Sequence, residues 1–272
     1  MQPGSQQGQQ GPQGPQQWLM PHWPGLPDGV GALSTTRRGG VSAPPYHDGQ
    51  GGGGLNLGSH AGDDPAHVAR NRAIVRAVLP AEPAWLSQVH GTAVVDVTHM
   101  HADAAPQADA CIATAGAVCA ILTADCLPVL FCDVGGKVVG AAHAGWRGLA
   151  AGVLESTLEA MRAAGAGEIT AWLGPAIGQY QFEVGPEVMQ AFLARAPDAS
   201  AARHVTAAFS AIEGRPDKFL ADIYALARAI LRRHGVSQVA GGEFCTVSNS
   251  ARFYSYRRDG VTGRQATLIW IK

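Results

Sequence analysis

The segment TADCLPVLFCDVGGKVVGAAHAGWRG, residues 123–148, decides how this chain folds. It contains two runs that are rich in apolar residues, Leu127–Cys132 and Lys137–Ala142, and they are joined through Val134-Gly135-Gly136. Two such runs around a Gly-Gly pair are typical of a β-hairpin. The sequence therefore predicts an antiparallel pair of strands near the middle of the chain.

The register of this hairpin follows from its turn. If Gly135 and Gly136 are the turn residues, the ladder places Cys126 opposite Gly145. His143 then lies on the same face as Cys126 and is its diagonal neighbour, roughly 7–8 Å away at backbone level. Because two side chains can close that gap, the hairpin predicts that Cys126 and His143 reach one metal ion.

Further elements are expected on both sides of the hairpin. An Asp N-cap followed by Pro at the first helical position predicts a helix over 64–79. The other expected helices are 148–164, 186–195 and 218–234, and the other expected strands are 93–97, 118–122, 252–256 and 265–271. Since helices and strands follow one another without a regular βαβ rhythm, we predict an α+β fold with mixed or antiparallel sheets.

Composition indicates the domain organisation. Residues 1–17 consist almost entirely of Gln, Gly and Pro, and we expect them to form a disordered tail. Over its 272 residues the chain is 46% hydrophobic and only 15% charged, which is enough apolar material for one large core. We therefore expect 18–272 to form a single catalytic domain, with a flexible Gly-rich loop at Gly49–Gly54.

Charge and apolar patterning exclude two classes of partner. The 20 Lys and Arg residues are balanced by 21 acidic residues without an extended basic stripe, so we expect no nucleic acid partner. No secretory signal precedes Arg37, and the apolar run Cys111–Leu122 is too short to span a membrane. Five cysteines, an odd number, favour reduced thiols. We expect a cytoplasmic protein that works as a monomer or a homodimer.

A third metal ligand is expected near the hairpin pair. His90 lies in the polar segment SQVHG, which we place in a strand-end loop like the segments of Cys126 and His143, and Gly91 gives its backbone freedom. Two imidazoles and a thiolate supply three protein ligands, the number in catalytic zinc sites that leave a fourth position open. Blue-copper sites use the same set, so the sequence predicts Zn²⁺, with Cu²⁺ as the alternative.

Several motifs in the same order resemble the YfiH-like family. They include the three ligand segments and also STTRRGGVS (34–42), LNLGSHAGD (55–63), WLGPAIG (172–178) and FYSYRRDGVTGRQATLIWI (253–271). Members of this family have been described as multicopper polyphenol oxidase (laccase) domain proteins, as peptidoglycan editing factors and as purine nucleoside phosphorylases with adenosine deaminase activity. The resemblance covers roughly 30–272, although the Gly-rich run ahead of Leu55 departs from the usual compact loop.

This resemblance implies the fold and the reaction. It implies zinc ligands at His90, Cys126 and His143 and layers of helices enclosing β-sheets in an α/β/β/α arrangement. The implied activity is phosphorolysis of adenosine, inosine and methylthioadenosine, so the partners would be a small-molecule nucleoside and phosphate. Adenosine deaminase activity is implied as well, although the chain lacks the HxE and PCxxC signature of the known zinc deaminases.

The resemblance also suggests residue roles, each with a structural alternative. Arg147 and Arg37 are candidates to bind phosphate through the planar fork of the guanidinium, and a surface salt bridge is the alternative for each. Asn56 and His60 are candidates to hold ribose or to assist proton transfer, whereas Asn56 could simply stabilise its loop. Gln88 either contacts the substrate or braces the loop of His90.

Four further residues have weaker assignments. Asp125 adjoins Cys126 but should point to the opposite strand face, so we expect a structural role. Cys245 could lie beside the pocket or be a buried free thiol. Trp146 and Tyr254 could stack on a purine or belong to the core.

Three other functions remain open at this stage. A copper oxidase is one, but a multicopper enzyme needs many paired imidazoles, and only His99 and His101 form an HxH pair. Another is an amidase that edits peptidoglycan precursors, with Cys126 as nucleophile and His143 as base. A metal-binding scaffold is the third, and it predicts a closed site with a fourth ligand, for which the sequence offers no candidate.

Overall fold

The computed structural model describes residues 17–100 and 105–272. The expected tail, apart from its last residue Gln17, lies outside the described residues, and so does His101. The strands of the two main sheets are β1 (Val30–Ser34), β3 (Pro83–Ala84), β4 (Val94–Asp96), β5 (Ala110–Ala113), β6 (Val118–Thr123), β7 (Leu127–Asp133), β8 (Val139–Ala144), β9 (Ile169–Leu173), β13 (Val239–Gly241) and β14 (Gln265–Ile271). They form a six-stranded sheet, in the order β13-β9-β7-β8-β5-β4, and a four-stranded sheet, in the order β1-β14-β6-β3.

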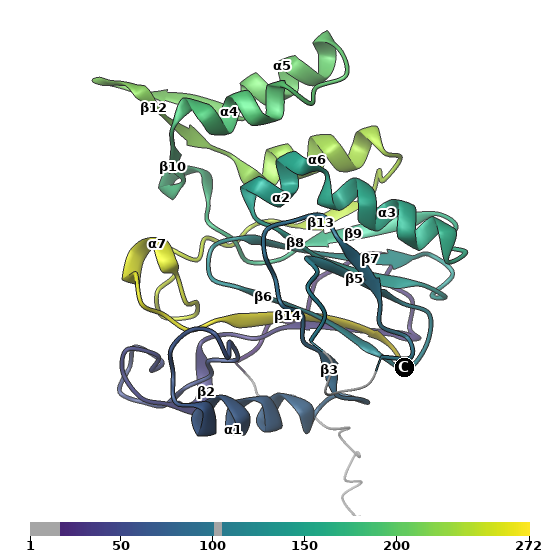
Figure 1. Ribbon diagram of the computed structural model, residues 1–272, viewed down its shortest axis with the longest axis vertical. Helices are drawn as coiled ribbons and strands as arrows, with labels where there is room; N and C mark the ends of the chain where they lie inside the picture. Colours follow the sequence, from purple (N-terminus) through teal and green to yellow (C-terminus); the bar gives the residue numbers. More distant parts are fainter. Residues whose placement is uncertain (1–16, 101–104) are drawn as a thin grey trace, which may run out of the picture.

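Helices cover the outer faces of both sheets, as Figure 1 shows. Above the six-stranded sheet lie α2 (Trp146–Ala151), α3 (Val153–Ala163) and α6 (Ile223–Arg233), and below the four-stranded sheet lies α1 (Pro65–Arg76). This is the predicted α/β/β/α arrangement of an α+β fold. None of the helices in the described part of the chain is long and apolar enough to cross a bilayer.

A smaller unit projects from the helical layer at the top of Figure 1. Its sheet has the order β10-β12-β11, and α4 and α5 lie against it. The bounds of these elements are β10 Glu183–Val184, α4 Pro186–Leu193, α5 Ala199–Ala207, β11 Phe209–Ile212 and β12 Arg215–Ala221. The remaining elements are β2 (Arg38–Ser42), a 3₁₀ turn (Gln179–Gln181) and the short helix α7 (Tyr256–Asp259).

The central hairpin has the predicted register. Its pairs run from Leu127 opposite Ala144 to Cys132 opposite Val139, and the same register extended by one step places Cys126 opposite Gly145. Strand β8 begins at Val139, two residues later than expected. Residues 134–137 form the turn, closed by a hydrogen bond from the N–H of Gly136 to the carbonyl of Asp133.

Strand β7 lies at the centre of the core, and all seven of its residues are buried. Because successive side chains of a strand point to opposite faces, Val129 and Phe131 pack under the helices, whereas Leu130 and Cys132 pack between the two sheets. Full burial of one large apolar side chain contributes about 1.5–3 kcal/mol. The hairpin that carries two of the candidate ligands is therefore among the most firmly anchored parts of the chain.

Three expected elements were wrong. The helix expected over 148–164 is divided at Gly152, whose φ of 106° lies in the left-handed region and ends α2 before α3 begins. The helix expected over 218–234 starts only at Ile223, because 215–221 pair with β11 as a strand. The strand expected over 252–256 does not form, since Ser255 caps α7 by accepting the N–H of Arg258.

Helix α1 confirms its predicted start. Asp64 caps it by accepting the N–H of Ala66, and Pro65 is its first residue. The helix ends at Arg76, three residues before the expected end.

Candidate functional site

His90, Cys126 and His143 come together at the ends of their segments. One ligand atom from each residue lies within 4.8 Å of the other two, and Sγ of Cys126 lies 3.7 Å from Nε2 of His90. The two imidazole rings stand edge to face with their centroids 4.7 Å apart. Among residues 17–100 and 105–272 this is the one group of three such side chains close enough to share a metal ion.

The donor set fits a single metal ion. In tetrahedral zinc sites the Zn–S distance is about 2.3 Å and the Zn–N distance about 2.0–2.1 Å, which separates sulfur from nitrogen by roughly 3.6 Å. The 3.7 Å between Cys126 and His90 matches that separation. Three protein donors would leave a fourth position for water or a substrate atom.

One buried carboxylate, that of Asp109, positions both histidines. Its Oδ1 accepts hydrogen bonds from Nδ1 of His143 and from the backbone N–H of His90, both at 2.8 Å. Its Oδ2 accepts from the N–H groups of Val89 and Gly91, at 3.1 and 2.7 Å. Because Nδ1 of His143 faces Asp109, its Nε2 is left for the cluster, the usual arrangement behind a metal-binding histidine.

Sequence reasoning missed Asp109. The signal was present in QADACIA, where an acidic residue directly precedes the fully buried strand β5. An ionised side chain is seldom fully buried unless it is paired, so a carboxylate adjoining such a run indicates a partner in the interior.

Two non-glycine residues beside the site have positive φ. His90 has a φ of 62° and Asp125 a φ of 95°, conformations that cost on the order of 1–3 kcal/mol each. The N–H bonds to Asp109 hold the loop of His90. Asp125 accepts from Oγ1 of Thr246 at 2.5 Å and from the N–H of Arg257 at 2.7 Å. These contacts give Asp125 the structural role that was expected for it.

Gly145 lies directly against the cluster. A Cβ atom at this position would come within 2.9 Å of Sγ of Cys126 and within 2.9 Å of Cδ2 of His90. Both contacts are shorter than real Cβ atoms make, so any side chain here would displace a candidate ligand. The close approach of the α2 start to the hairpin therefore requires glycine.

The cluster holds charge without a metal. Burial alone would raise the pKa of the Cys126 thiol, but hydrogen bonds and charge from His143 and His90 outweigh it and lower that pKa to about 6. Burial would lower the pKa of His143, but Asp109 and Cys126 raise it to about 9. Burial alone would raise the pKa of Asp109, but hydrogen bonds from His143 and from the backbone N–H donors lower that pKa to about 2. Below about pH 9, a metal ion that binds here is therefore expected to displace a proton from His143.

The three candidate ligands open onto a cavity of about 630 Å³, a size typical of small-molecule sites. Its wall includes four other residues that the sequence singled out for the substrate: His60, Gln88, Trp146 and Arg147. Arg147 is exposed, and its guanidinium lies 4.6 Å from the centre of the Trp146 ring.

Gln88 lines the cavity and braces its loop as well. Its Nε2 donates to the carbonyl of Leu122 and its Oε1 accepts the N–H of the same residue, both at 2.9 Å. The amide of Gln88 thus joins the His90 segment to the end of β6.

Four of the sequence candidates lie outside the cavity wall. Arg37 is buried and donates to the carbonyls of His47 and Ser250, and it lies over the ring of the fully buried Tyr254. These contacts correspond to structural roles, so we do not place a phosphate at Arg37 or a purine on Tyr254. Cys245 borders a separate hollow of about 340 Å³.

Asn56 is fully buried and also lies behind the wall. Its Oδ1 accepts the N–H groups of Gly58 and Arg264 at 3.0 and 2.9 Å, and its Nδ2 donates to Asp63. These contacts match the loop-stabilising alternative. Both Gly58 and Arg264 line the cavity, so Asn56 holds part of the wall in place.

Comparison with known proteins gives a consistent result. Residues 31–272 match the family described as multi-copper polyphenol oxidoreductase laccase. The purine nucleoside phosphorylase YfiH of Escherichia coli strain K12 is 51% identical over 256 residues, 93% of this chain and 98% of that protein. A Pseudomonas aeruginosa purine nucleoside phosphorylase is 49% identical, over 94% and 98% of the two chains. The crystal structure of a Neisseria meningitidis protein matches with a TM-score of 0.83 at 47% identity, covering 94% of this chain and 100% of that one.

Proposed function

The chain belongs to the family described as multi-copper polyphenol oxidoreductase laccase, and from this membership and the cavity geometry we propose that it is a zinc-dependent purine nucleoside phosphorylase. One observation carries the proposal. Two imidazoles and a thiolate open onto a cavity of about 630 Å³ in a chain about half identical to proteins named purine nucleoside phosphorylase. The proposed substrates are adenosine, inosine and methylthioadenosine, together with inorganic phosphate.

The proposed metal ligands are His90, Cys126 and His143. Imidazole and thiolate are donors that suit zinc and copper, and three of them leave a position open. When bound, a metal ion of this kind acts as a Lewis acid and lowers the pKa of water. We favour one zinc over several coppers because no second cluster of three His, Cys or acidic side chains exists within the described residues.

In the proposed phosphorolysis, an oxygen of phosphate donates an electron pair to the anomeric carbon of the ribose. The bond from that carbon to the purine nitrogen breaks, its electron pair stays with the purine, and that nitrogen takes up a proton. The products are a free purine and ribose 1-phosphate. We assign proton donation to His60, purine stacking to Trp146 and charge stabilisation to Arg147, because all three line the cavity.

A second reaction, deamination of adenosine, is proposed at the same site. Water supplies the oxygen that replaces the amino group, and ammonia leaves. The open fourth position implied by a three-donor set favours this reaction, as zinc deaminases use an equivalent arrangement. We also propose a cytoplasmic location, because all five cysteines lie in the described residues and are free thiols.

Product analysis tests the proposal. Protein of known metal content is incubated with adenosine, inosine and methylthioadenosine, with and without phosphate. Release of hypoxanthine from inosine should require phosphate and yield ribose 1-phosphate, and ammonia release from adenosine should disappear in His143→Ala. Cleavage that needs no phosphate would contradict the mechanism. Faster oxidation of a phenol with oxygen uptake would instead favour the copper oxidase. Hydrolysis of a peptidoglycan precursor by metal-free protein would favour the Cys126 amidase.

A further inference from the structure

Two further arginines, Arg72 of α1 and Arg264 directly before β14, line the cavity. Both are half-buried. Within the described ranges 17–100 and 105–272, neither guanidinium forms an ion pair with a carboxylate. The charge of Glu82 acts on Arg72, but Glu82 forms its ion pair with Arg76. The cavity wall therefore holds two partly desolvated cations that form no ion pair, although the charges of Cys126 and Asp125 act on Arg264.

The contacts of these guanidiniums leave donors free. Arg72 uses Nε to donate to the carbonyl of Leu57 at 3.0 Å, and it stacks on the ring of Trp85 at 4.4 Å. Arg264 uses Nη1 to donate to the carbonyls of Thr262 and Gly263, at 2.9 and 3.0 Å. Each guanidinium has five N–H donors, so each retains several that can bind an anion. Burial lowers the pKa of both groups, and a bound anion would offset that cost.

The backbone of Leu57 contacts both arginine residues. The carbonyl of Leu57 accepts from Arg72, and the N–H of Leu57 donates to the carbonyl of Arg264 at 3.1 Å. Gly58 packs on Arg264 so closely that a Cβ there would lie 2.7 Å from Cγ of the arginine. The chain then continues through His60, which also lines the cavity. Leu57 thus joins the two arginine segments, through the guanidinium of Arg72 on one side and the backbone carbonyl of Arg264 on the other, and both side chains line the same cavity.

The other arginines of the wall differ from this pair. Arg147 is exposed, so water solvates its charge and its lack of an ion pair carries no cost. Arg257 donates through Nη1 to the carbonyl of Glu183 at 3.0 Å and is exposed as well. Arg72 and Arg264 alone combine partial burial, free donors and a place on the wall among the described arginines. Arg264 is also near enough to Cys126 for the thiolate charge to act on it.

We propose that Arg72 and Arg264 bind inorganic phosphate beside the proposed metal centre. Guanidinium groups suit this ligand because their planar forks donate pairs of hydrogen bonds to tetrahedral oxyanions. The catalytic meaning of the site, in which the bound phosphate attacks the nucleoside, rests on the proposed function. Anion binding itself does not, so the two can be tested separately.

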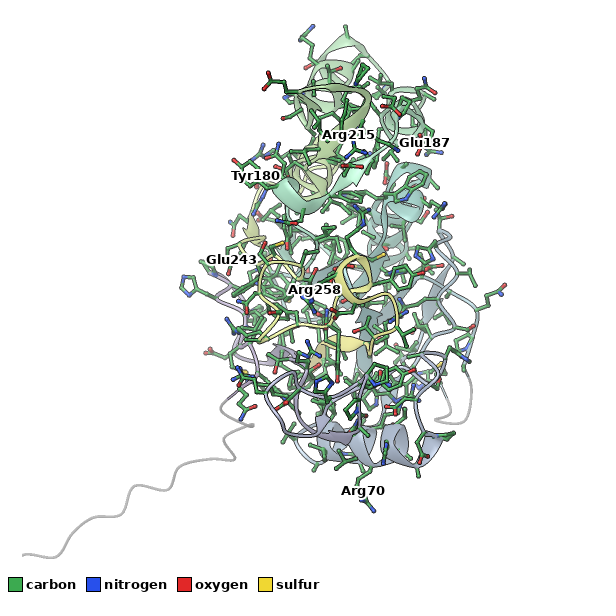
Figure 2. All side chains as sticks on the ribbon, turned by 90° about the vertical axis from the view of Figure 1, so that its left-hand side faces the viewer. Arg70, Tyr180, Glu187, Arg215, Glu243 and Arg258 are labelled. Atoms are coloured by element: carbon green, nitrogen blue, oxygen red, sulfur yellow. The ribbon has the colours of Figure 1, made fainter. Side chains whose placement is uncertain are left out.

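Direct binding of inorganic phosphate to the purified full-length protein tests the site. Calorimetry compares the protein with Arg72→Gln, Arg264→Gln and the matched control Arg70→Gln. Arg70 lies on the same helix as Arg72, but Figure 2 shows it pointing away from the molecule. Each wall variant should raise the Kd for phosphate by about tenfold or more, the loss of one or two charge-assisted hydrogen bonds, with metal content unchanged. A Kd unaltered in both wall variants overturns the assignment.

Chemical protection provides a test that needs no variant. Phenylglyoxal modifies arginine, and peptide mapping measures the rate at each position. Inorganic phosphate should slow modification of Arg72 and Arg264 and leave Arg70 unaffected. Rates at Arg72 and Arg264 that phosphate does not change overturn the site, as does protection by adenosine 5′-monophosphate only. Protection by phosphate without any phosphorolysis would support the site and refute the proposed function. Phosphorolysis without protection would support the proposed function and refute the site.

Discussion

Two parts of the cavity wall hold their charged groups in opposite ways. We call the part at His90, Cys126 and His143 the metal end and the part at Arg72 and Arg264 the arginine end. At the metal end, the buried Asp109 carries the counter-charge for His143, from which it accepts one hydrogen bond, and fixes the loop of His90 through three more. At the arginine end, the organising residue is Asn56, a neutral amide that fixes Gly58 and the backbone of Arg264. At the metal end the charged His143 has acidic partners in direct contact, whereas at the arginine end neither guanidinium forms an ion pair within the described residues.

This difference indicates which ligand each end receives. A charge-assisted hydrogen bond to Asp109 holds the imidazole of His143 in a fixed direction, as a metal ion requires, and the same carboxylate holds the backbone of His90. Guanidiniums that are anchored only to carbonyl oxygens keep their positive charge available for an anion. We therefore expect changes at Asp109 to affect the metal and changes at Asn56 to affect phosphate.

The largest effect should come from Cys126→Ala. This variant removes the only thiolate of the cluster, so metal content measured by elemental analysis should fall from about one ion per chain to almost none. Cys119→Ala is the control, because Cys119 is fully buried between the sheets and its loss should cost packing only. Equal metal content in the two variants would refute the ligand assignment.

Asp109→Asn should weaken metal binding by about 10- to 100-fold, the range found when the partner of a metal-binding histidine is removed. An amide cannot accept all four of the hydrogen bonds that Asp109 accepts, and its own NH₂ would face N–H donors. Competition with a chelator measures the change. Asp96→Asn is the matched control, since Asp96 is exposed and caps only Thr98. An unchanged metal affinity would mean that the histidines hold their directions without the carboxylate.

Asn56→Ala should act on the other end. It leaves the N–H groups of Gly58 and Arg264 without an acceptor, and an unsatisfied buried donor costs about 1–3 kcal/mol. We expect lower thermal stability and a Kd for phosphate raised several-fold, with metal content unchanged. Loss of metal in this variant would show that the two ends are not independent.

Features that depend on local turn chemistry could be predicted from the sequence, and features that depend on contacts between distant segments could not. The hairpin register could be predicted because Gly135 and Gly136 fix it locally. The proximity of Cys126 and His143 followed from that register. Asp109 and Arg264 could not be placed, since the contacts that give them meaning join residues 34 and 208 positions apart. Short-range turn chemistry is visible in a sequence, whereas a contact between distant segments depends on the packing of whole sheets.

The incorrect helix and strand boundaries have a comparable cause. Nothing in the sequence around Gly152 distinguishes a helix break from a tolerated glycine, because the break depends on how α2 leaves the hairpin. Residues 215–221 became a strand because β11 and β10 pair with them on both sides. Pairing partners of this kind override local helical preference.

Proton release on metal binding should reveal the charge state of the metal end at intermediate pH. Between about pH 6 and pH 9 the cluster holds a proton on His143 and a thiolate at Cys126, since their pKa values are about 9 and about 6. Metal binding to metal-free protein at pH 7.5 should therefore release about one proton, and the number should fall toward zero as pH rises through 9. Calorimetry in buffers of different ionisation enthalpy measures it. No proton release at pH 7.5 would contradict the charged cluster.

The smallest effect should come from deletions at the N-terminus, which test where the folded domain begins. Residues 1–16 contain almost no apolar side chains to dock on the domain, so deleting them should leave the melting temperature, metal content and phosphate affinity unchanged. Deletion of 1–20 removes Trp18 and Leu19 as well. Both are buried, and Leu19 exchanges two backbone hydrogen bonds with Ser34 of β1. The longer deletion should therefore lower the melting temperature by several degrees. If the shorter deletion already lowered the melting temperature, the tail would have to pack on the domain, contrary to its composition.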